Sequence, residues 1–309
     1  MRTRQGLLSV VLAAAIGGAG CTQTPGAPAG APILRVLCTT FPMYLMTRNV
    51  AAGRAGVRVG IMLPAALGCP HDYVLTPQDM QKIAGADLLI ANGLGLEEFL
   101  GEPIAKANPR LTVVDTSDGI GEILYTTEAG PAGSRPGVRN PHAFASPALA
   151  AIISRNIAAA LAGAEPGGRA VFMANAEAYA ARLAGLAVAC REVSAALPSR
   201  RIVTEHAVFD YFARDCGLEI AAVIEEAPGQ EPAAARMLQL VGQIRRSGAA
   251  ALFTEPQYPA RVGRTIAREA GIPDAVLDPV ASGPDDPPLD YYERVMRQNF
   301  ETLRTTIRR

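Results

Sequence analysis

The sequence predicts an α/β protein of two similar lobes, each with a mainly parallel sheet, joined by one long rigid helix. The chain has 309 residues, which is enough for two domains of ordinary size. In each half, short apolar runs alternate with helical segments, which is the pattern of a parallel sheet covered on both faces. Between the halves, residues 169–197 contain no proline and a single glycine. Such a run predicts a helix roughly 40 Å long.

Composition narrows the class of protein. Hydrophobic residues make up 49% of the chain and charged residues 19%, which is typical of a globular protein. Lys+Arg and Asp+Glu are equal at 29 each, and the basic residues form no long block. Nucleic acid is therefore not an expected partner. We expect the chain to act as a monomer.

The N-terminus predicts export. Residues 1–20 combine a basic start with the apolar run Leu7–Ile16, which is shorter than the about 20 residues that span a bilayer, so we interpret them as a signal peptide. Small residues before Cys21 resemble the lipobox of bacterial lipoproteins, although Gly18 stands where a larger aliphatic residue is usual. Residues 21–32 then form a flexible tether. The expected location is the periplasm or the outer face of the cell membrane, with an anchor through a lipidated Cys21.

Residues 33–167 are expected to form the N-terminal lobe. Thr76 can cap a helix that runs to about Ala84, since Pro77 suits its first position and Asp79 follows three residues after the cap. Residues 118–140 lack a periodic pattern and predict an exposed loop. The expected strands are Ile33–Thr39, Val57–Leu63, Asp87–Ala91 and Leu111–Asp115. The other expected helices are Tyr44–Ala52 and a Ser146-capped helix that ends near Leu161.

Residues 168–198 are expected to form the linking helix, which Pro198 ends, and residues 199–309 the C-terminal lobe. The alternation of strands and helices starts again after Pro198. The expected strands are Arg201–Thr204, Glu219–Val223, Ala250–Thr254 and Ala275–Asp278. The expected helices are Ala207–Cys216 with Gly217 as its end, two helices that end at Gly248 and Gly271, and Leu289–Ile307.

Four cysteines follow Cys21 and permit two disulfides with three possible pairings. They are Cys38, Cys69, Cys190 and Cys216. We prefer Cys38 with Cys69 and Cys190 with Cys216, because each pair falls within one lobe. Buried free thiols are an equal alternative. A zinc thiolate site is disfavoured because no Cys-x-x-Cys spacing occurs.

The three histidines of the chain and one aspartate predict a metal site. His71 follows a predicted strand, His142 precedes a capped helix, and His206 follows Arg201–Thr204. Asp278 ends a predicted strand before Pro279. Ligands of open α/β folds bind at this edge of the sheet. Three imidazoles and a carboxylate form a tetrahedral set that suits Zn²⁺, and a metal bound by two ligands from each lobe would lie between the lobes.

Each of these residues also has a plain structural interpretation. A single loop histidine is more often a surface or hydrogen-bonded residue than a ligand, and an aspartate before proline is usually a cap or turn residue. The shared position of all the histidines at strand ends or helix starts outweighs those separate odds. Glu205 and Glu255 follow strands at the same edge, where they either orient an imidazole or serve as caps and ion-pair partners. Tyr73 and Phe209 are expected to wall the site.

Seven short segments carry a resemblance to a known family from about residue 33 to the end of the chain, in order and in spacing. They are Phe41-Pro42-Met43-Tyr44, Pro70-His71-Asp72-Tyr73 with Thr76-Pro77, Asn92-Gly93-Leu94-Gly95-Leu96-Glu97, Asn140-Pro141-His142, His206-Ala207-Val208-Phe209-Asp210-Tyr211-Phe212, Phe253-Thr254-Glu255-Pro256-Gln257 and Leu277-Asp278-Pro279. They resemble the zinc- and manganese-binding lipoproteins of bacterial ABC importers, the cluster A-I solute-binding proteins.

The resemblance implies a fold of two lobes bridged by a rigid helix, with a divalent transition metal held between the lobes. By matching motif, the implied ligands are His71, His142, His206 and Asp278. The implied partner is an ABC permease in the membrane, to which the metal is delivered. In this family a histidine at the position of His206 usually accompanies zinc and a glutamate manganese, so zinc is expected, with manganese or iron as the alternative. Residues 118–139 contain no histidine, unlike the loop of many zinc importers.

Two other classes of function use the same residues. A zinc-dependent hydrolase could use three histidine ligands with Asp278 or Glu255 as the base, and an adhesin could hold a structural metal. Four protein ligands leave no open position for a reacting water, and the chain has no His-Glu-x-x-His motif. We therefore expect a metal-binding protein rather than an enzyme.

Overall fold

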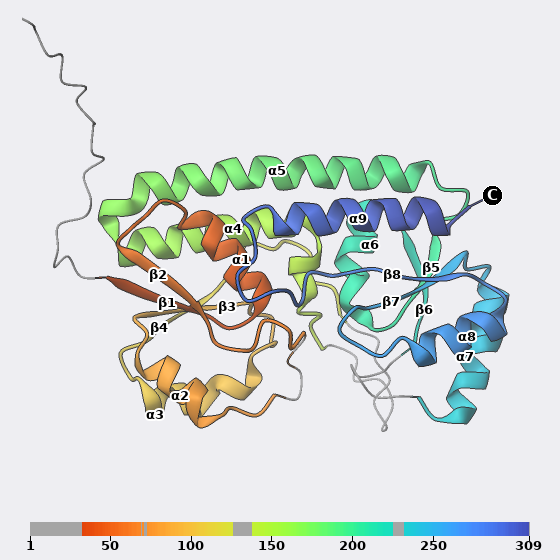
Figure 1. The fold of residues 1–309 in the computed structure, drawn as a ribbon, viewed down its shortest axis with the longest axis horizontal. Coiled ribbons are helices and arrows are strands. Elements are labelled where there is room, and N and C mark those ends of the chain that lie inside the picture. The colour runs from red at the N-terminus through yellow and green to blue at the C-terminus, as the bar shows by residue number, and fades with distance from the viewer. Residues whose placement is uncertain (1–32, 69, 71–72, 126–137, 225–231, 309) are drawn as a thin grey trace, which may run out of the picture. The chain divides into compact units, whose positions relative to one another are not determined.

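Two parallel four-stranded sheets form the framework of the protein in the computed structural model (Figure 1). The structure describes residues 33–68, 70, 73–125, 138–224 and 232–308. The strand orders are β2-β1-β3-β4 and β6-β5-β7-β8, so the second sheet repeats the first. The strands are β1 Leu34–Cys38, β2 Val57–Ile61, β3 Leu88–Ala91, β4 Thr112–Asp115, β5 Arg201–Thr204, β6 Glu219–Val223, β7 Ala251–Thr254 and β8 Asp274–Val276. The predicted fold class is confirmed.

Helices cover both faces of each sheet. Helices α1, α4, α5, α6 and α9 pack against one another and form one continuous layer over both lobes, whereas α2 with α3 and α7 with α8 form separate pairs. The helices are α1 Phe41–Val50, α2 Pro77–Ala84, α3 Gly101–Ala107, α4 Pro147–Ala164, α5 Arg169–Ala195, α6 Asp210–Cys216, α7 Ala234–Ser247, α8 Arg261–Ala270 and α9 Tyr291–Thr306.

The alternation of side chains along the strands divides the core into three clusters. On β1, Val36 and Cys38 belong to a large cluster that continues through both lobes, whereas Leu37 belongs to a smaller one beside α2 and α3. On β5, Ile202 joins the same large cluster and Val203 joins the smaller one beside α7 and α8. Successive side chains point to opposite faces of a sheet, so both lobes share one core and each has a second core of its own.

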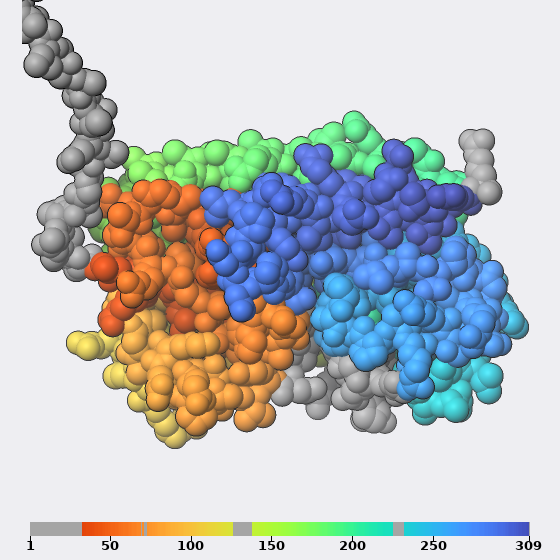
Figure 2. Space-filling view, viewed as in Figure 1, coloured from red at the N-terminus to blue at the C-terminus, as the bar shows by residue number. Residues whose placement is uncertain are grey.

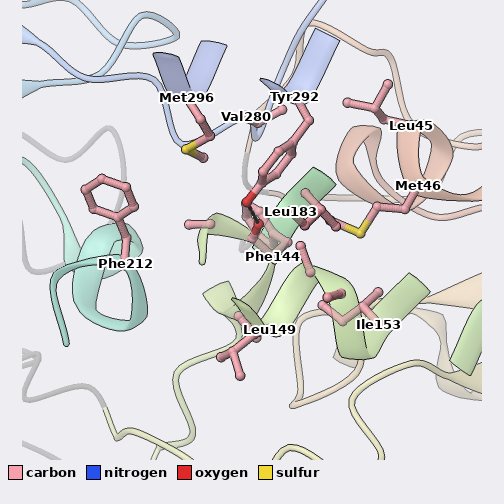
Figure 3. Packing of buried hydrophobic residues seen from close by; sticks show 14 of the residues in the cluster. Leu45, Met46, Phe144, Leu149, Ile153, Leu183, Phe212, Val280, Tyr292 and Met296 are labelled. Carbon is pink, nitrogen blue, oxygen red and sulfur yellow. Dashed lines mark hydrogen bonds between the residues drawn. The ribbon is translucent and has the colours of Figure 1, made fainter. Parts of the chain in front are cut away.

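Helix α5 spans both lobes, as the sequence predicts (Figure 1). It has 27 residues, equivalent to roughly 40 Å at 1.5 Å per residue. Its buried side chains recur every three or four residues, which places them on one stripe of the helix. They include Phe172, Ala176, Tyr179, Leu183, Leu186 and Cys190. This stripe packs on α4 and α9, and Figure 3 shows Leu183 among the core residues of these helices.

Local signals predicted most of the helix ends. Thr76 forms the expected capping box with Asp79, and the Ser146 hydroxyl accepts a hydrogen bond from the backbone N–H of Leu149. Helix α6 ends at Gly217, whose φ of 74° is left-handed. Several details of the prediction were wrong: α1 begins three residues before the expected Tyr44, and β2 ends at Ile61 rather than Leu63. The short helix α3 was not foreseen, and the last strand ends at Val276, so Asp278 lies in the following loop.

The segment between β8 and α9 crosses back onto the N-terminal lobe. Gly283 donates a backbone hydrogen bond to Ala65, and Arg48 of α1 forms an ion pair with Asp286 at 2.9 Å. Figure 2 shows the C-terminal part of the chain lying directly against the N-terminal lobe. The chain therefore connects the two lobes a second time, and residues Pro32–Arg309 form one compact unit. The boundaries expected between the lobes stay a prediction.

One of the two preferred disulfides is present. Cys190 of α5 is bonded to Cys216 of α6. Cys38 is instead a buried free thiol, so the preferred partner for it was wrong and the alternative holds. Cys69 lies outside the described residues, as do the signal peptide and the tether predicted for residues 1–32.

Candidate metal centre

His142 is the first residue of a short 3-10 helix, His142–Ala145, that leads into α4. Its side chain is completely buried. The backbone oxygen of Phe144 in the same turn accepts a hydrogen bond from the Tyr292 hydroxyl of α9 at 2.9 Å (Figure 3). The turn that carries this imidazole is thus fixed by both the N-terminal lobe and the C-terminal helix.

Asn140 holds the His142 ring in place. The Oδ1 atom of Asn140 lies 2.8 Å from His142 Nδ1 and also accepts the backbone N–H of His142 at 3.0 Å. The side-chain amide of Asn140 donates to the backbone oxygen of Ala207 and to Asp210 Oδ2. Burial raises the pKa of Asp210 to about 6, although this hydrogen bond and the nearby His206 act to lower it. The Nδ1 atom of His142 therefore faces an acceptor, as is usual for the nitrogen of a metal-binding histidine that does not bind the metal.

His206 lies two residues after the end of β5, immediately before the 3-10 helix Ala207–Phe209 and α6. Its ring is also completely buried. The Nδ1 atom lies 2.5 Å from Glu255 Oε1, and both side chains have no solvent exposure. The backbone N–H of Glu255 donates to Glu205 Oε2 at 2.7 Å, and Gln257 donates to the other oxygen of Glu255. Of the two roles left open for Glu255, contact with an imidazole is the one observed.

The structure brings these two histidines together from different lobes. The ring centroids of His142 and His206 are 5.2 Å apart, with the ring planes at 78° to each other. Burial of two facing imidazoles is costly unless each has polar partners. Both have them, and both present the same nitrogen, Nδ1, to the protein. This arrangement is typical of metal-binding histidines.

Asp278 follows β8 and is held by its backbone. Its N–H donates to Asn299 Oδ1 of α9, and Asn299 donates back to its carbonyl oxygen. The side-chain Oδ1 accepts the N–H of Val280, a buried residue with a left-handed φ of 63°. Burial raises the pKa of Asp278 to about 6, and the charge of Glu255 adds to that increase, whereas the Val280 hydrogen bond lowers it. Asp278 is therefore within electrostatic range of the carboxylate that contacts His206.

His71 lies outside the described residues. Within the part of the chain that the structure describes, no three His, Cys, Asp or Glu side chains form a group that could hold a metal ion. His142 and His206 are the two predicted ligands that are seen to meet, and the complete set of four stays a prediction.

The structure shows how Tyr73 and Phe209 pack, and their expected role as walls of the site stays a prediction. The Tyr73 hydroxyl donates to Asp79 at 2.8 Å, and its ring packs on Phe99 in the outer core of the N-terminal lobe. Phe209 packs on Phe212 in the shared core. Phe144 lies beside the site, with its ring centroid 5.9 Å from that of His142, and so does Tyr258, whose ring centroid is 5.8 Å from that of His206. No sequence signal singles out Tyr258.

Comparison with known proteins agrees with the fold and finds metal-binding proteins among the relatives. The family model described as "Zinc-uptake complex component A periplasmic" matches residues 36–306. The high-affinity zinc uptake system protein ZnuA of Bacillus subtilis is 26% identical over 285 residues, which cover 89% of this chain and 88% of that protein. The zinc-binding lipoprotein AdcA of Streptococcus pneumoniae serotype 4 is 27% identical over 284 residues. The match covers 88% of this chain but 56% of AdcA, so the chain spans little more than half of that relative.

A solved structure gives the same result for the fold. The solute-binding protein FpvC of Pseudomonas aeruginosa in complex with Mn²⁺ superposes with a TM-score of 0.78 and 29% sequence identity. The superposition covers 89% of this chain and 98% of FpvC. Another structure of FpvC holds Ni²⁺. The scaffold described here is therefore one on which related proteins bind divalent transition metals.

Proposed function

This chain belongs to the family of periplasmic A components of zinc-uptake complexes, and on that premise we propose that it captures Zn²⁺ outside the cytoplasm. It then delivers the ion to the membrane permease of an ABC importer. The family consists of solute-binding components of transport systems rather than enzymes, which removes the hydrolase alternative.

The observation that carries the proposal is the buried pair His142 and His206. Imidazole nitrogen is a preferred ligand of Zn²⁺, and a buried pair with both Nδ1 atoms on acceptors has its Nε2 atoms prepared for coordination. We propose His71 and Asp278 as the other two ligands, so that the set is His71, His142, His206 and Asp278. Two ligands then come from each half of the chain, and binding holds the lobes together.

Zinc is the metal that the donor set favours. Three imidazoles suit Zn²⁺ better than Mn²⁺, which prefers carboxylate and water ligands. The names of ZnuA and AdcA support zinc, whereas the FpvC complexes with Mn²⁺ and Ni²⁺ show that a related scaffold accepts other ions. Manganese is therefore the competitor to test.

The proposal also covers location and assembly. The family description places such proteins in the periplasm, and one relative is named a lipoprotein. We propose that residues 1–20 direct export, that Cys21 carries the lipid anchor, and that residues 21–32 tether a monomer to the membrane beside its permease. Cleavage and acylation would leave a chain that begins at Cys21, which mass spectrometry of the cell-made protein can detect.

Titration of the protein after removal of metal tests the function. We expect one Zn²⁺ per chain and preference for Zn²⁺ over Mn²⁺ in direct competition. Asp278→Asn should weaken binding, whereas Asp274→Asn, at the other end of β8 and paired with Arg264, should leave it unchanged. Affinity should fall below about pH 6.5, because protons compete for the imidazoles. The raised pKa of Asp278, about 6, acts in the same direction. Absence of stoichiometric binding of either ion would reject the proposal.

A further inference from the structure

We propose that Asp210 and Asn140 form a relay across the lobe interface that fixes the His142 ring for zinc, so that both act as positioning residues. The inference rests on the proposed function, because the ring is positioned for the metal. It assigns a role to Asp210, which lies at the start of α6 and is not a predicted ligand. The consequence is that the lobe carrying His206 also sets the orientation of His142.

The Asn140 side chain uses its whole hydrogen-bonding capacity. A side-chain amide has two N–H donors and an oxygen with two lone pairs. The oxygen accepts from the backbone N–H of His142 at 3.0 Å and lies 2.8 Å from the ring atom Nδ1. The nitrogen donates to Ala207 O at 2.8 Å and to Asp210 Oδ2 at 2.9 Å. Asn140 is completely buried, so water cannot replace any of these partners without structural change.

Asp210 is one of three groups that fix which way this amide points, together with the Ala207 carbonyl and the His142 backbone N–H. If the amide were reversed, its oxygen would face the Asp210 carboxylate and the Ala207 carbonyl, which are both acceptors. Its N–H groups would then face His142. In the observed orientation the oxygen faces His142 Nδ1, and an oxygen can only accept. Nδ1 must therefore carry the proton, and the lone pair of the neutral ring lies on Nε2, where a metal can bind.

The relay connects one lobe to the other. Asn140 and His142 precede α4, whereas Ala207 and Asp210 belong to the turn and helix that follow His206. Backbone contacts hold the relay from both sides: Asn140 N–H donates to Leu124 O, and the Tyr211 hydroxyl donates to Asn140 O at 3.0 Å. Displacement of α6 would therefore release the amide and, with it, the preferred proton position of His142.

The same helix supplies a matched control. Asp215, also on α6, accepts a hydrogen bond from the Ser146 hydroxyl of the N-terminal lobe. It forms a second carboxylate contact between α6 and the other lobe, and the structure gives it no hydrogen bond to Asn140. Substitution of Asp215 should therefore cost stability without a change in the His142 ring.

The test combines two measurements on the full chain at one fixed neutral pH. ¹⁵N NMR of the imidazoles in zinc-free protein reports the tautomer of His142. Its signals can be assigned by substitution because the chain has three histidines. Zinc titration reports affinity. Asp210→Ala should shift His142 from the pure Nδ1–H form to a mixture of tautomers and lower zinc affinity by roughly 10–100-fold, as is typical for partners of metal ligands.

Asp210→Asn should restore both properties, because its side-chain oxygen can still accept from Asn140. Asp210→Leu removes the acceptor while it fills the space, and should reproduce Asp210→Ala if the latter folds poorly. Asp215→Ala should leave the tautomer unchanged. An unchanged tautomer in both Asp210→Ala and Asp210→Leu would overturn the relay, as would equal effects of Asp215→Ala.

The two proposals fail in different ways. If the unsubstituted protein binds no zinc, the proposed function fails, but the tautomer measurement in zinc-free protein still decides whether the relay exists. If Asp210→Ala changes the tautomer and zinc affinity stays the same, the relay does not position His142 for the metal and the inference is rejected.

Discussion

The two lobes have the same strand order, yet they support their histidines differently. His142 of the N-terminal lobe faces a neutral amide, that of Asn140, whereas His206 of the C-terminal lobe faces the carboxylate of Glu255. A carboxylate raises the basicity of an imidazole ligand but is costly to bury, and an amide fixes the ring without adding charge. The repeated scaffold therefore places two imidazoles close together, although the groups that contact them differ in charge.

The two lobes also differ in the covalent state of their cysteines. The C-terminal lobe is tied to the long helix by the Cys190–Cys216 disulfide, and the N-terminal lobe contains the free thiol of Cys38. Burial raises the pKa of Cys38 to about 12, so this thiol is protonated and unreactive at neutral pH. The two lobes therefore differ in how much of their stability depends on oxidation.

The largest expected difference concerns loss of each ring in zinc-free protein. His206→Ala leaves the Glu255 carboxylate buried without its imidazole, which should lower the free energy of unfolding by about 3–5 kcal/mol. His142→Ala leaves a neutral amide oxygen that keeps its bond from the backbone at residue 142, so about 1–3 kcal/mol is expected. Urea unfolding measures both. His206→Gln, which retains an N–H donor, is the control, and equal losses for the two alanine variants would contradict the comparison.

Loss of the disulfide should have the next largest effect. Cys190 and Cys216 are 26 residues apart, so the bond restricts the unfolded chain. The double variant Cys190→Ala, Cys216→Ala should be less stable by about 2–4 kcal/mol. Urea unfolding with and without reductant checks this, since the unsubstituted protein should respond to the reductant and the double variant should not. Cys38→Ala should keep that response, and a response that persists in the double variant would disprove the assignment.

The smallest expected effect concerns the charge beside His206. Glu255→Gln gives this histidine an amide support like that of His142, and its side-chain oxygen can still accept from Nδ1. Zinc affinity should fall by about 10-fold, the lower end of the range for such partners, with the His206 tautomer unchanged. Competition with a zinc chelator measures the affinity. Glu219→Gln removes a carboxylate that pairs with Arg201 on the surface and should have no effect. Wild-type affinity in Glu255→Gln would show that the charge is dispensable.

Sequence reasoning succeeded where the cause is local. The capping box of Thr76 and the left-handed Gly217, Gly248 and Gly271 lie at helix ends where the pattern predicts them, because each depends on a few neighbouring residues. Helix α3 was missed because its seven residues are too few to show a period and include Pro103. The partner of Cys38 was wrong because even cysteine counts permit pairings without requiring them.

The candidate site likewise contains residues that the sequence predicted and residues that it did not. Positions at strand ends and helix starts singled out His142, His206 and Asp278. The residues that hold these side chains in place could not be found from such positions. Asn140 and Asp210 are 70 residues apart, and Glu205 and Glu255 are 50 residues apart. Pairs at such distances along the chain meet only when the sheets and the shared helical layer are assembled.

By itself, the sequence determined two repeated parallel sheets, the long helix between them and the residue types that can hold a transition metal. Periodicity, caps and spacing are local properties, so they can be recognised in the sequence alone. Only the tertiary structure decided that an amide supports one histidine and a carboxylate the other, and that Asp210 of one lobe accepts a hydrogen bond from the amide that faces the ring of the other. Those choices depend on which buried donor lies opposite which acceptor, and packing alone sets that.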